Sequence, residues 1–179
     1  KESEDESQTT NAETKLAGIS QIEGRINQIF SLLQNYPGIE RAVIYLKNPD
    51  PSKEFFKPVH GFGSIQRENL MPIEAKNPFI RPFIQSPTTV TRSSLMQSVP
   101  PPYLGTNAYG EFSASPIYDD DGEFNGLLVV DSNSGKRLPP SIESIIEHSA
   151  MMIATILKGE KQIASLDSNL RQQGVFFQT

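Results

Sequence analysis

The chain offers few side chains that could perform chemistry, and they lie far apart. Its 179 residues include two histidines, His60 and His148, and no cysteine. Either histidine could act as an axial ligand of haem, but neither has other metal-ligand residues at short spacing. The lack of cysteine excludes disulfides, thiol nucleophiles, cysteine-ligated zinc and thioether-linked chromophores. We therefore interpret both histidines as surface or core-edge residues and predict no metal site.

Three further patterns come close to known motifs without completing them. The acidic run Asp119–Asp121 lacks the alternate ligand spacing and the final Glu of a calcium loop, and Gly122 after it indicates a turn. The run Gly135–Arg137 lacks the upstream glycine of a phosphate-binding loop. Serines are frequent, but none lies in a Gly-x-Ser-x-Gly elbow. Because no acid, base or nucleophile is assembled, we predict that the chain is not an enzyme.

Composition limits the class of partner. The net charge is −5, but residues 1–13 hold five acids and one base, so the remainder is nearly neutral with 15 basic and 16 acidic residues. A neutral body without a basic stripe argues against nucleic acid as a partner. No apolar run approaches the roughly 18 residues that a membrane span needs. We expect residues 1–13 to be a flexible acidic lead-in, and the first residue, Lys1, suggests a fragment of a longer protein.

Apolar spacing predicts the elements of the first half of the chain. Residues 14–36 read as a helix with one apolar stripe, whose spacing also matches a short heptad seam. Two strands, over 41–46 and 54–60, follow it, and Pro58 indicates that the second is at an edge. Residues 64–110 hold seven of the 14 prolines and predict a long packed loop with a short helix at 79–85 and a brief strand at 88–92. The helical stripe comprises Ile19, Ile22, Ile26, Ile29 and Leu33.

The second half contains the clearest local signal, a hairpin. Two strands, 112–118 and 124–131, flank an Asp-Gly turn, which favours residues that tolerate positive φ. Both faces of the second strand carry apolar residues, so we expect it to be central and covered on both sides. A long helix begins after Leu138 with a broad apolar face. Beyond Gly159 only a narrow stripe continues, which is typical of a coiled-coil seam: Ile156, Ile163, Leu166 and Leu170.

This order of elements, with two local stretches, resembles the GAF family of sensory domains. The stretches are Pro37–Leu46 (PGIERAVIYL) and Ser115–Asp131 (SPIYDDDGEFNGLLVVD), and the resemblance spans about residues 16–160. It implies an α+β fold with a twisted antiparallel sheet of five or six strands, in the GAF/PAS-like style. The N- and C-terminal helices would pack on one face of the sheet. A small-molecule pocket would lie on the other face, beneath the long loop.

The resemblance also directs attention to residues that could hold a ligand. Arginines in or beside the loop could clamp a carboxylate or phosphate, tyrosines offer a flat apolar surface with a hydroxyl, and serines on one strand could donate hydrogen bonds inward. The candidates are Arg81, Arg92, Tyr103, Tyr109, Ser113 and Ser115. The alternative interpretation is that the arginines are exposed and the tyrosines fill the fold. The cofactor is unknown, although the family members that hold bilin covalently or reduce methionine sulfoxide use cysteine, which this chain lacks.

The function implied is that of a cytoplasmic sensory module in signal transduction. We expect domain limits of 14–160 for the GAF-like body and 161–179 for a helical extension with a frayed end. A homodimer would form through the two apolar stripes: Ile19, Ile22, Ile26, Ile29, Ile156, Ile163, Leu166 and Leu170. Ligand capture would then shift the packing of the last helix and reach an output domain of the full-length chain. Two alternatives remain: a ligand-free dimerisation scaffold whose pocket is filled by side chains such as Tyr103 and Phe112, and a non-covalent haem sensor.

Overall fold

A computed structural model describes residues 21–50 and 52–177 of the chain. Helix covers residues 21–34 at the start of this part. The strands are β1 (Arg41–Lys47), β2 (Phe55–Phe62), β3 (Ile73–Glu74), β4 (Val90–Ser93), β5 (Glu111–Tyr118) and β6 (Phe124–Asp131). The helices are α2 (Arg81–Gln85) and α3 (Ile142–Phe177), with 3-10 turns η1 (Arg67–Asn69) and η2 (Pro102–Leu104). The predicted lead-in, residues 1–13, and Ile19 lie outside the described residues.

The strands form one six-stranded sheet in the order β3-β2-β1-β6-β5-β4, and every neighbouring pair is antiparallel. The predicted α+β class with an antiparallel sheet is confirmed. The expected Asp-Gly turn joins β5 to β6, where Gly122 has φ of +77° and its N–H bonds the carbonyl of Asp119 at 3.1 Å. Glycine suits this position because it adopts positive φ without steric cost. The β5–β6 hairpin therefore forms as its sequence predicts.

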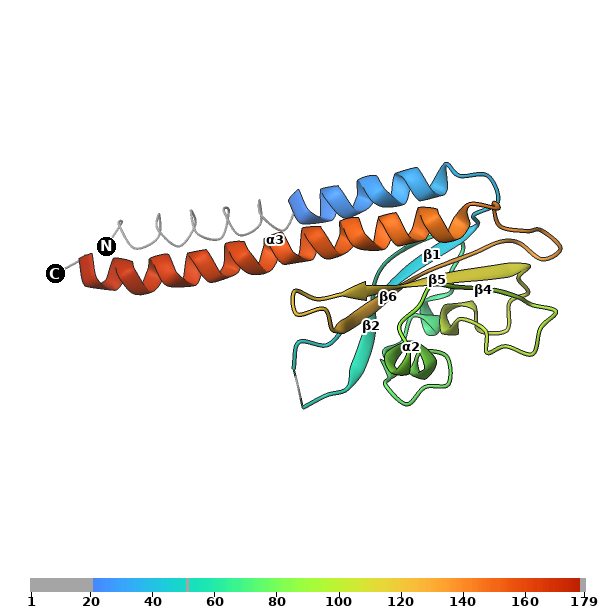
Figure 1. Ribbon diagram of the computed structural model, residues 1–179, viewed down its shortest axis with the longest axis horizontal. Helices are drawn as coiled ribbons and strands as arrows, with labels where there is room; N and C mark the ends of the chain where they lie inside the picture. Colours follow the sequence, from blue (N-terminus) through green and yellow to red (C-terminus); the bar gives the residue numbers. More distant parts are fainter. Residues whose placement is uncertain (1–20, 51, 178–179) are drawn as a thin grey trace.

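Each face of the sheet is covered by a different layer. Figure 1 shows the helix over 21–34 and α3 side by side on one face, with α2 and the long loop segment on the other. The helix-side core contains Leu128 and Val130 of β6, and the loop-side core contains Leu127 and Val129, all of them fully buried. Alternation along a strand sends successive side chains to opposite faces. Both terminal helices on one face and a central, doubly covered β6 are thus confirmed.

The long segment between β2 and β5 departs in detail from its prediction. The short helix α2 begins at Arg81 rather than at residue 79, with Pro82 in its first turn, and β4 is shifted by about two residues. The two-residue strand β3 gave no signal in the sequence, and it pairs only with Phe55 and Phe56. Beyond these two residues the outer edge of β2 has no strand partner among the described residues. Pro58 lies in this open stretch, opposite Tyr45 at a register shift, which suits a residue that cannot donate to a ladder.

Helix α3 extends well past the sheet. Its first half places Ile142, Ile146, Ala150 and Ile153 in the helix-side core. In its second half, Leu166 and Leu170 are 60% and 64% exposed. The side chain of Ile163 is outside the described part of the structure. The first half of the helix therefore belongs to the core, whereas the described residues of the second half are exposed and include two leucines.

Candidate functional site: a buried polar cluster beneath the loop

The loop-side face of the sheet carries a tightly filled apolar core. Side chains from the loop segment, α2 and η2 fill it together with strand residues: Phe56, Ile73, Phe79, Ile80, Phe83, Leu104, Phe112 and Ala114. Ile80 and Leu104 are 0% exposed, and Phe79 lies 5.7 Å from Phe112 between ring centroids. Such packing excludes water. A polar group placed in this layer must therefore find its partners within the protein.

Within this layer lies a buried ion pair between two neighbouring strands. Arg41 begins β1 and Asp131 ends β6, and the two residues are direct partners in the ladder. Arg41 Nη2 and Nε lie 2.8 and 2.9 Å from Asp131 Oδ1. The residues are 7% and 0% exposed. Burial raises the pKa of the Asp131 carboxyl above its ordinary value, and hydrogen bonds from Arg41 and Tyr103 partly counter this shift.

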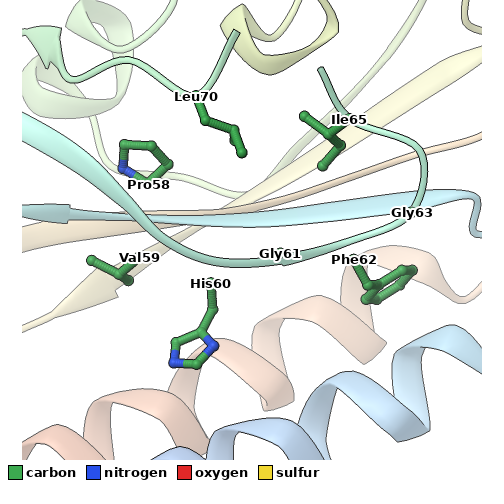
Figure 2. A pocket seen from close by; sticks show the side chains of 8 residues that line it. All are labelled: Pro58, Val59, His60, Gly61, Phe62, Gly63, Ile65 and Leu70. Carbon is green, nitrogen blue, oxygen red and sulfur yellow. The ribbon is translucent and has the colours of Figure 1, made fainter. Parts of the chain in front are cut away.

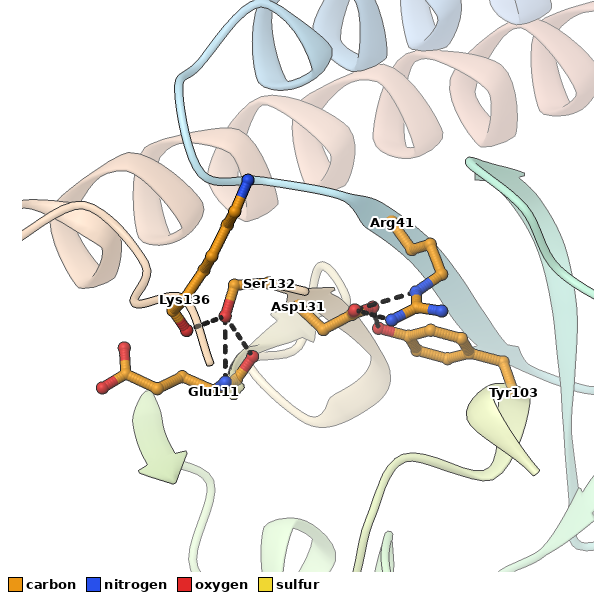
Figure 3. Close-up of polar contacts among 6 residues, drawn as sticks. All are labelled: Arg41, Tyr103, Glu111, Asp131, Ser132 and Lys136. Atoms are coloured by element: carbon orange, nitrogen blue, oxygen red, sulfur yellow. Dashed lines mark hydrogen bonds and ion pairs between the residues drawn. The ribbon is translucent and has the colours of Figure 1, made fainter. Parts of the chain in front are cut away.

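The second carboxylate oxygen of Asp131 is taken by a residue of the loop. Tyr103, in η2, donates its hydroxyl to Asp131 Oδ2 at 2.5 Å, and its side chain is completely buried (Figure 3). Burial raises the pKa of Tyr103 well above its usual value, and the neighbouring Asp131 carboxylate adds to the shift. The phenol is therefore a neutral donor to an anionic acceptor, which is the stronger type of hydrogen bond. This hydrogen bond thus fastens the loop to β6, and the Arg41–Asp131 pair links the same carboxylate to β1.

A second tyrosine lies in the same layer, but its hydroxyl lacks a hydrogen-bond partner among the described residues. Tyr45 of β1 is 0% exposed, and its hydroxyl makes no hydrogen bond of good geometry with the described residues. Burial raises the pKa of Tyr45, and the nearby backbone of Tyr103 offsets part of that effect. Tyr45 and Tyr103 belong to the same loop-side core, and Tyr45 adds to the raised pKa of Tyr103. We call Arg41, Tyr45, Tyr103 and Asp131 the buried polar cluster.

The chain immediately after Asp131 is hydrogen-bonded to the segment that precedes α3. Ser132 Oγ accepts the N–H of Glu111 at 2.9 Å and donates to the carbonyl of Lys136 at 2.8 Å (Figure 3). The Glu111 carboxylate accepts the N–H of Leu138 at 2.9 Å. Asp131 is therefore one residue from a hydrogen-bonded connection that leads directly into the long helix.

The structure brings together only part of the predicted ligand set. Tyr103 belongs to the buried polar cluster, and Tyr109 is half-buried in the same layer, 6.1 Å from Phe112 between ring centroids. Arg81 and Arg92 are exposed, and Arg92 Nη1 donates to the carbonyl of Thr91 at 3.1 Å. The arginines thus lie at the surface, as the alternative interpretation had it.

Ser113 and Ser115 lie on the opposite face of the sheet from Tyr103. Their ladder partners on β6 are Val130 and Leu128, which belong to the helix-side core. Ser113 Oγ donates to the carbonyl of Val90 at 3.0 Å, and Ser115 Oγ lies 3.0 Å from Thr89 Oγ1. The prediction that these serines point into a pocket beneath the loop is therefore corrected: they join β5 to the segment around β4.

Sequence reasoning missed Arg41, Tyr45 and Asp131 as a group. A signal was present, because both charged residues adjoin runs of apolar strand residues, Ala42–Leu46 and Leu127–Val130. Ninety positions separate Arg41 from Asp131, and only the antiparallel pairing of β1 with β6 brings them together. Charged residues at strand ends are ordinarily solvated, so their burial becomes visible only in the folded sheet.

The surface formed by the described residues has hollows, and two of them contain a histidine. The first, of about 230 Å³, follows the open edge of β2 and has His60, Phe62, Ile65 and Leu70 in its lining (Figure 2). The second, of about 360 Å³, lies between the two terminal helices and includes Tyr36 and His148. The two histidines are thus in separate hollows. Among the described residues, no three metal-binding side chains gather into one group.

The predicted dimer residues divide into two sets. Ile26 and Ile29 are 4% and 5% exposed in the helix-side core, and Ile22 and Ile156 pack partly against it. Their stripe contacts the chain's own sheet, so in this conformation little of it is open to a partner. Leu166 and Leu170 are open to solvent. The outward surface of the helix pair carries other apolar residues: Leu32, Tyr36, Met151 and Met152.

No protein-family model matches the sequence, and no curated protein matches it as a relative. Solved structures do match. A GAF domain of a two-component sensor histidine kinase from Bacillus halodurans superposes with a TM-score of 0.63 at 16% identity, covering 79% of this chain and 97% of that one. The GAF domain of an Acinetobacter phosphoenolpyruvate-protein phosphotransferase gives 0.60 at 14% identity, covering 84% and 96%. The fold is GAF-like.

The GAF-like fold is also found in enzymes. The free methionine-R-sulfoxide reductase from Neisseria meningitidis, solved in complex with its substrate, superposes with a TM-score of 0.61 at 13% identity, covering 79% of this chain and 80% of that one. Regulatory and enzymatic proteins thus share this architecture, and the fold alone does not separate the two classes. Over the residues described, none of the helices has the length and hydropathy of a membrane span.

Proposed function

We propose that this chain is a GAF-like sensory or regulatory module of a signalling protein. Its receiving part would be the loop-covered face of the sheet, and its transmitting part would be α3. The observation that carries the proposal is the division of α3, which packs in the core from Ile142 to Ile153 and continues as an exposed helix that carries Leu166 and Leu170. If α3 served only the core, we would expect polar residues at the exposed positions of its second half.

Polar contacts support a physical route between the two parts. The buried polar cluster ends at Asp131, and the adjoining Ser132 and Glu111 hold the segment that leads to Leu138. On the other side of the sheet, Thr91 Oγ1 donates to the Glu143 carboxylate in the first turn of α3 at 2.9 Å. A shift of β4, β5 or the loop therefore strains contacts at the start of α3. Signalling further requires that a ligand bind two arrangements with different affinity.

We infer a cytoplasmic homodimer as the working form, with the exposed half of α3 paired against its copy ahead of an output domain. Sedimentation equilibrium tests this directly. We expect the wild type to be a dimer at high micromolar concentration and the variant Leu166→Glu/Leu170→Glu to be a monomer. The matched control, Ser165→Glu/Ser168→Glu, places the same charges on neighbouring exposed positions and should stay dimeric. A monomeric wild type would overturn the dimer.

A small-molecule ligand completes the proposal, and a thermal-shift screen tests it. Nucleotides, amino acids and organic acids would each be added to the dimer, because binding to the native state raises its melting temperature. We expect no catalytic turnover of the ligand, since the carboxylate of Asp131 is fully buried and the chain has no cysteine. Turnover of any compound that raises the melting temperature would contradict this non-enzymatic assignment.

A second candidate, a ligand-free dimerisation scaffold, is favoured by one observation. Tyr103 and Leu104 are 0% exposed and Phe112 is 3% exposed, so the chain's own side chains occupy the layer beneath the loop. A scaffold would show an intact dimer by sedimentation and no compound that shifts the melting temperature. The two functions therefore differ in the screen and agree in the sedimentation experiment.

A further inference from the structure

We infer that Tyr103 fills, as a built-in substitute, a binding site for a small neutral aromatic molecule that carries a hydroxyl group. Asp131, with Arg41 behind it, would recognise the hydroxyl, and η2 would move aside to admit the molecule. The inference rests on the proposed function in taking the loop-covered face as the receiving part. It adds the recognition groups, the chemical class of the ligand and the residue that the ligand displaces.

The recognition groups belong to the sheet and not to the loop. Arg41 and Asp131 are ladder partners on β1 and β6, and Tyr45 lies four residues further along β1. The Tyr45 hydroxyl is completely buried and has no hydrogen-bond partner among the described residues. An unpaired buried hydroxyl costs stability, and a ligand with a second polar atom could pair with it. The sheet therefore retains a polar receptor when Tyr103 is removed.

The loop that carries Tyr103 is attached at few points. From Ser94 to Tyr109, a stretch that the structure describes in full, only Pro101, Tyr103 and Leu104 are buried. Leu95, on the same loop, is 95% exposed. Segments with few buried contacts open at low free-energy cost. Once the Tyr103–Asp131 bond is released, the buried side chains of Pro101 and Leu104 are the contacts that η2 would have to give up, while the strands stay paired.

The geometry around Asp131 selects the chemical class. Arg41 contacts Asp131 Oδ1 through two nitrogens and balances the charge of the carboxylate. When Tyr103 leaves, the position open to a ligand is therefore the single acceptor Oδ2. A neutral hydroxyl or ring N–H fits that acceptor, as the phenol of Tyr103 does. A carboxylate ligand would meet the repulsion of Asp131. The surroundings are aromatic and aliphatic, so the remainder of the ligand must be apolar, and a planar ring would take the place of the Tyr103 ring.

Isothermal titration with 4-methylphenol, the side-chain analogue of tyrosine, tests the inference. We expect saturable binding to Tyr103→Ala that is at least tenfold tighter than binding to the wild type, because the competing side chain is gone. Tyr36→Ala, which removes a tyrosine that is 41% exposed, is the matched control and should bind like the wild type. Toluene, which lacks the hydroxyl, should bind Tyr103→Ala at least tenfold more weakly than 4-methylphenol.

Three outcomes would overturn the inference: equal binding of 4-methylphenol to Tyr103→Ala and Tyr36→Ala, equal binding of toluene and 4-methylphenol, or no saturable binding to any of the proteins. If Tyr103→Ala does not fold, as judged by circular dichroism, Tyr103→Phe replaces it. That variant keeps the ring but loses the bond to Asp131, so it should bind 4-methylphenol several-fold more tightly than the wild type. These results are independent of the sedimentation experiment, so failure of this inference and failure of the proposed dimer are distinguishable.

Discussion

Two buried tyrosines, one bonded and one not, allow a sharp test of the buried polar cluster. Tyr103 and Tyr45 are both 0% exposed and both lie in the loop-side layer. The hydroxyl of Tyr103 donates to Asp131, whereas that of Tyr45 has no partner among the described residues. Substitution of each by Phe removes one oxygen and leaves the ring in place. The two variants should therefore change stability in opposite directions.

The magnitudes follow from the hydrogen bonding of each hydroxyl. Tyr103→Phe removes a hydrogen bond to a charged acceptor and should lower the free energy of unfolding by about 1.5–3 kcal/mol. Tyr45→Phe removes an unsatisfied buried hydroxyl and should raise the free energy of unfolding by about 1 kcal/mol. The two variants would then differ by roughly 3 kcal/mol. For a chain of this size that corresponds to about 6–12 °C between their melting temperatures.

Urea denaturation followed by far-ultraviolet circular dichroism measures both changes in one series. The chain contains no tryptophan, so the dichroism signal of α3 and the sheet is the suitable probe. Tyr36→Phe, at a residue that is 41% exposed, controls for the removal of a hydroxyl at the surface. Equal destabilisation by Tyr45→Phe and Tyr103→Phe would show that both hydroxyls are bonded. That result would refute the assignment of Tyr45 as the unpaired member of the cluster.

Three further predictions concern the same structure. Burial raises the pKa of Tyr45 and Tyr103, so above pH 10 the unfolded chain loses protons that the native state keeps. The free energy of unfolding should therefore fall with rising pH, by about 1.4 kcal/mol per pH unit for each tyrosine. In urea titrations between about pH 9 and 11, a Tyr45→Phe/Tyr103→Phe double variant should show a flatter fall. Asp131→Leu leaves the Arg41 guanidinium buried without its partner and should cost about 3–5 kcal/mol, whereas the double variant Arg41→Met/Asp131→Leu should cost much less. Arg41→Met completes the double-mutant cycle in urea, and simple additivity in that cycle would contradict the ion pair. Gly126→Ala would drive a Cβ into the backbone oxygen of Tyr45 and should lower the free energy of unfolding by more than about 2 kcal/mol, while Gly159→Ala, where nothing lies within 4 Å of the new Cβ, should raise it by up to about 1 kcal/mol; the same urea series measures both.

The elements that could be predicted are those whose signals are local. The β5–β6 hairpin follows from an Asp-Gly turn between apolar runs, and the doubly covered β6 follows from apolar residues on both of its faces. The two-residue strand β3 could not be predicted, because two residues have no periodicity. Its pairing with Phe55 and Phe56 depends on where the loop folds back. Local pattern therefore specified the sheet's centre and left its edge undetermined.

The sequence predicts the apolar stripe of the first helix but does not show whether the stripe packs against the chain's own sheet or against a second chain. The spacing of Ile22, Ile26 and Ile29 correctly indicates a helix with one apolar side. A heptad seam and a stripe that covers a sheet have the same spacing over two turns. Here the apolar side of the helix packs against the sheet, since Ile26 and Ile29 belong to the helix-side core. The dimer proposal therefore rests on Leu166 and Leu170, which lie open to solvent in the second half of α3.

The buried polar cluster gives a physical reason to place the receiving part at this point in the fold. A buried ion pair contributes little net stability, because apolar side chains of similar volume would serve as well. Its consequence is therefore positional: Asp131 holds the loop through Tyr103, and the chain leaves Asp131 through Ser132 toward Leu138 and α3. An exchange of Tyr103 for a ligand would replace the hydrogen bond that Asp131 accepts at the end of β6. Because that end is hydrogen-bonded to the connection before α3, the proposed exchange would make the binding energy of the ligand and the position of the helix depend on the same few contacts.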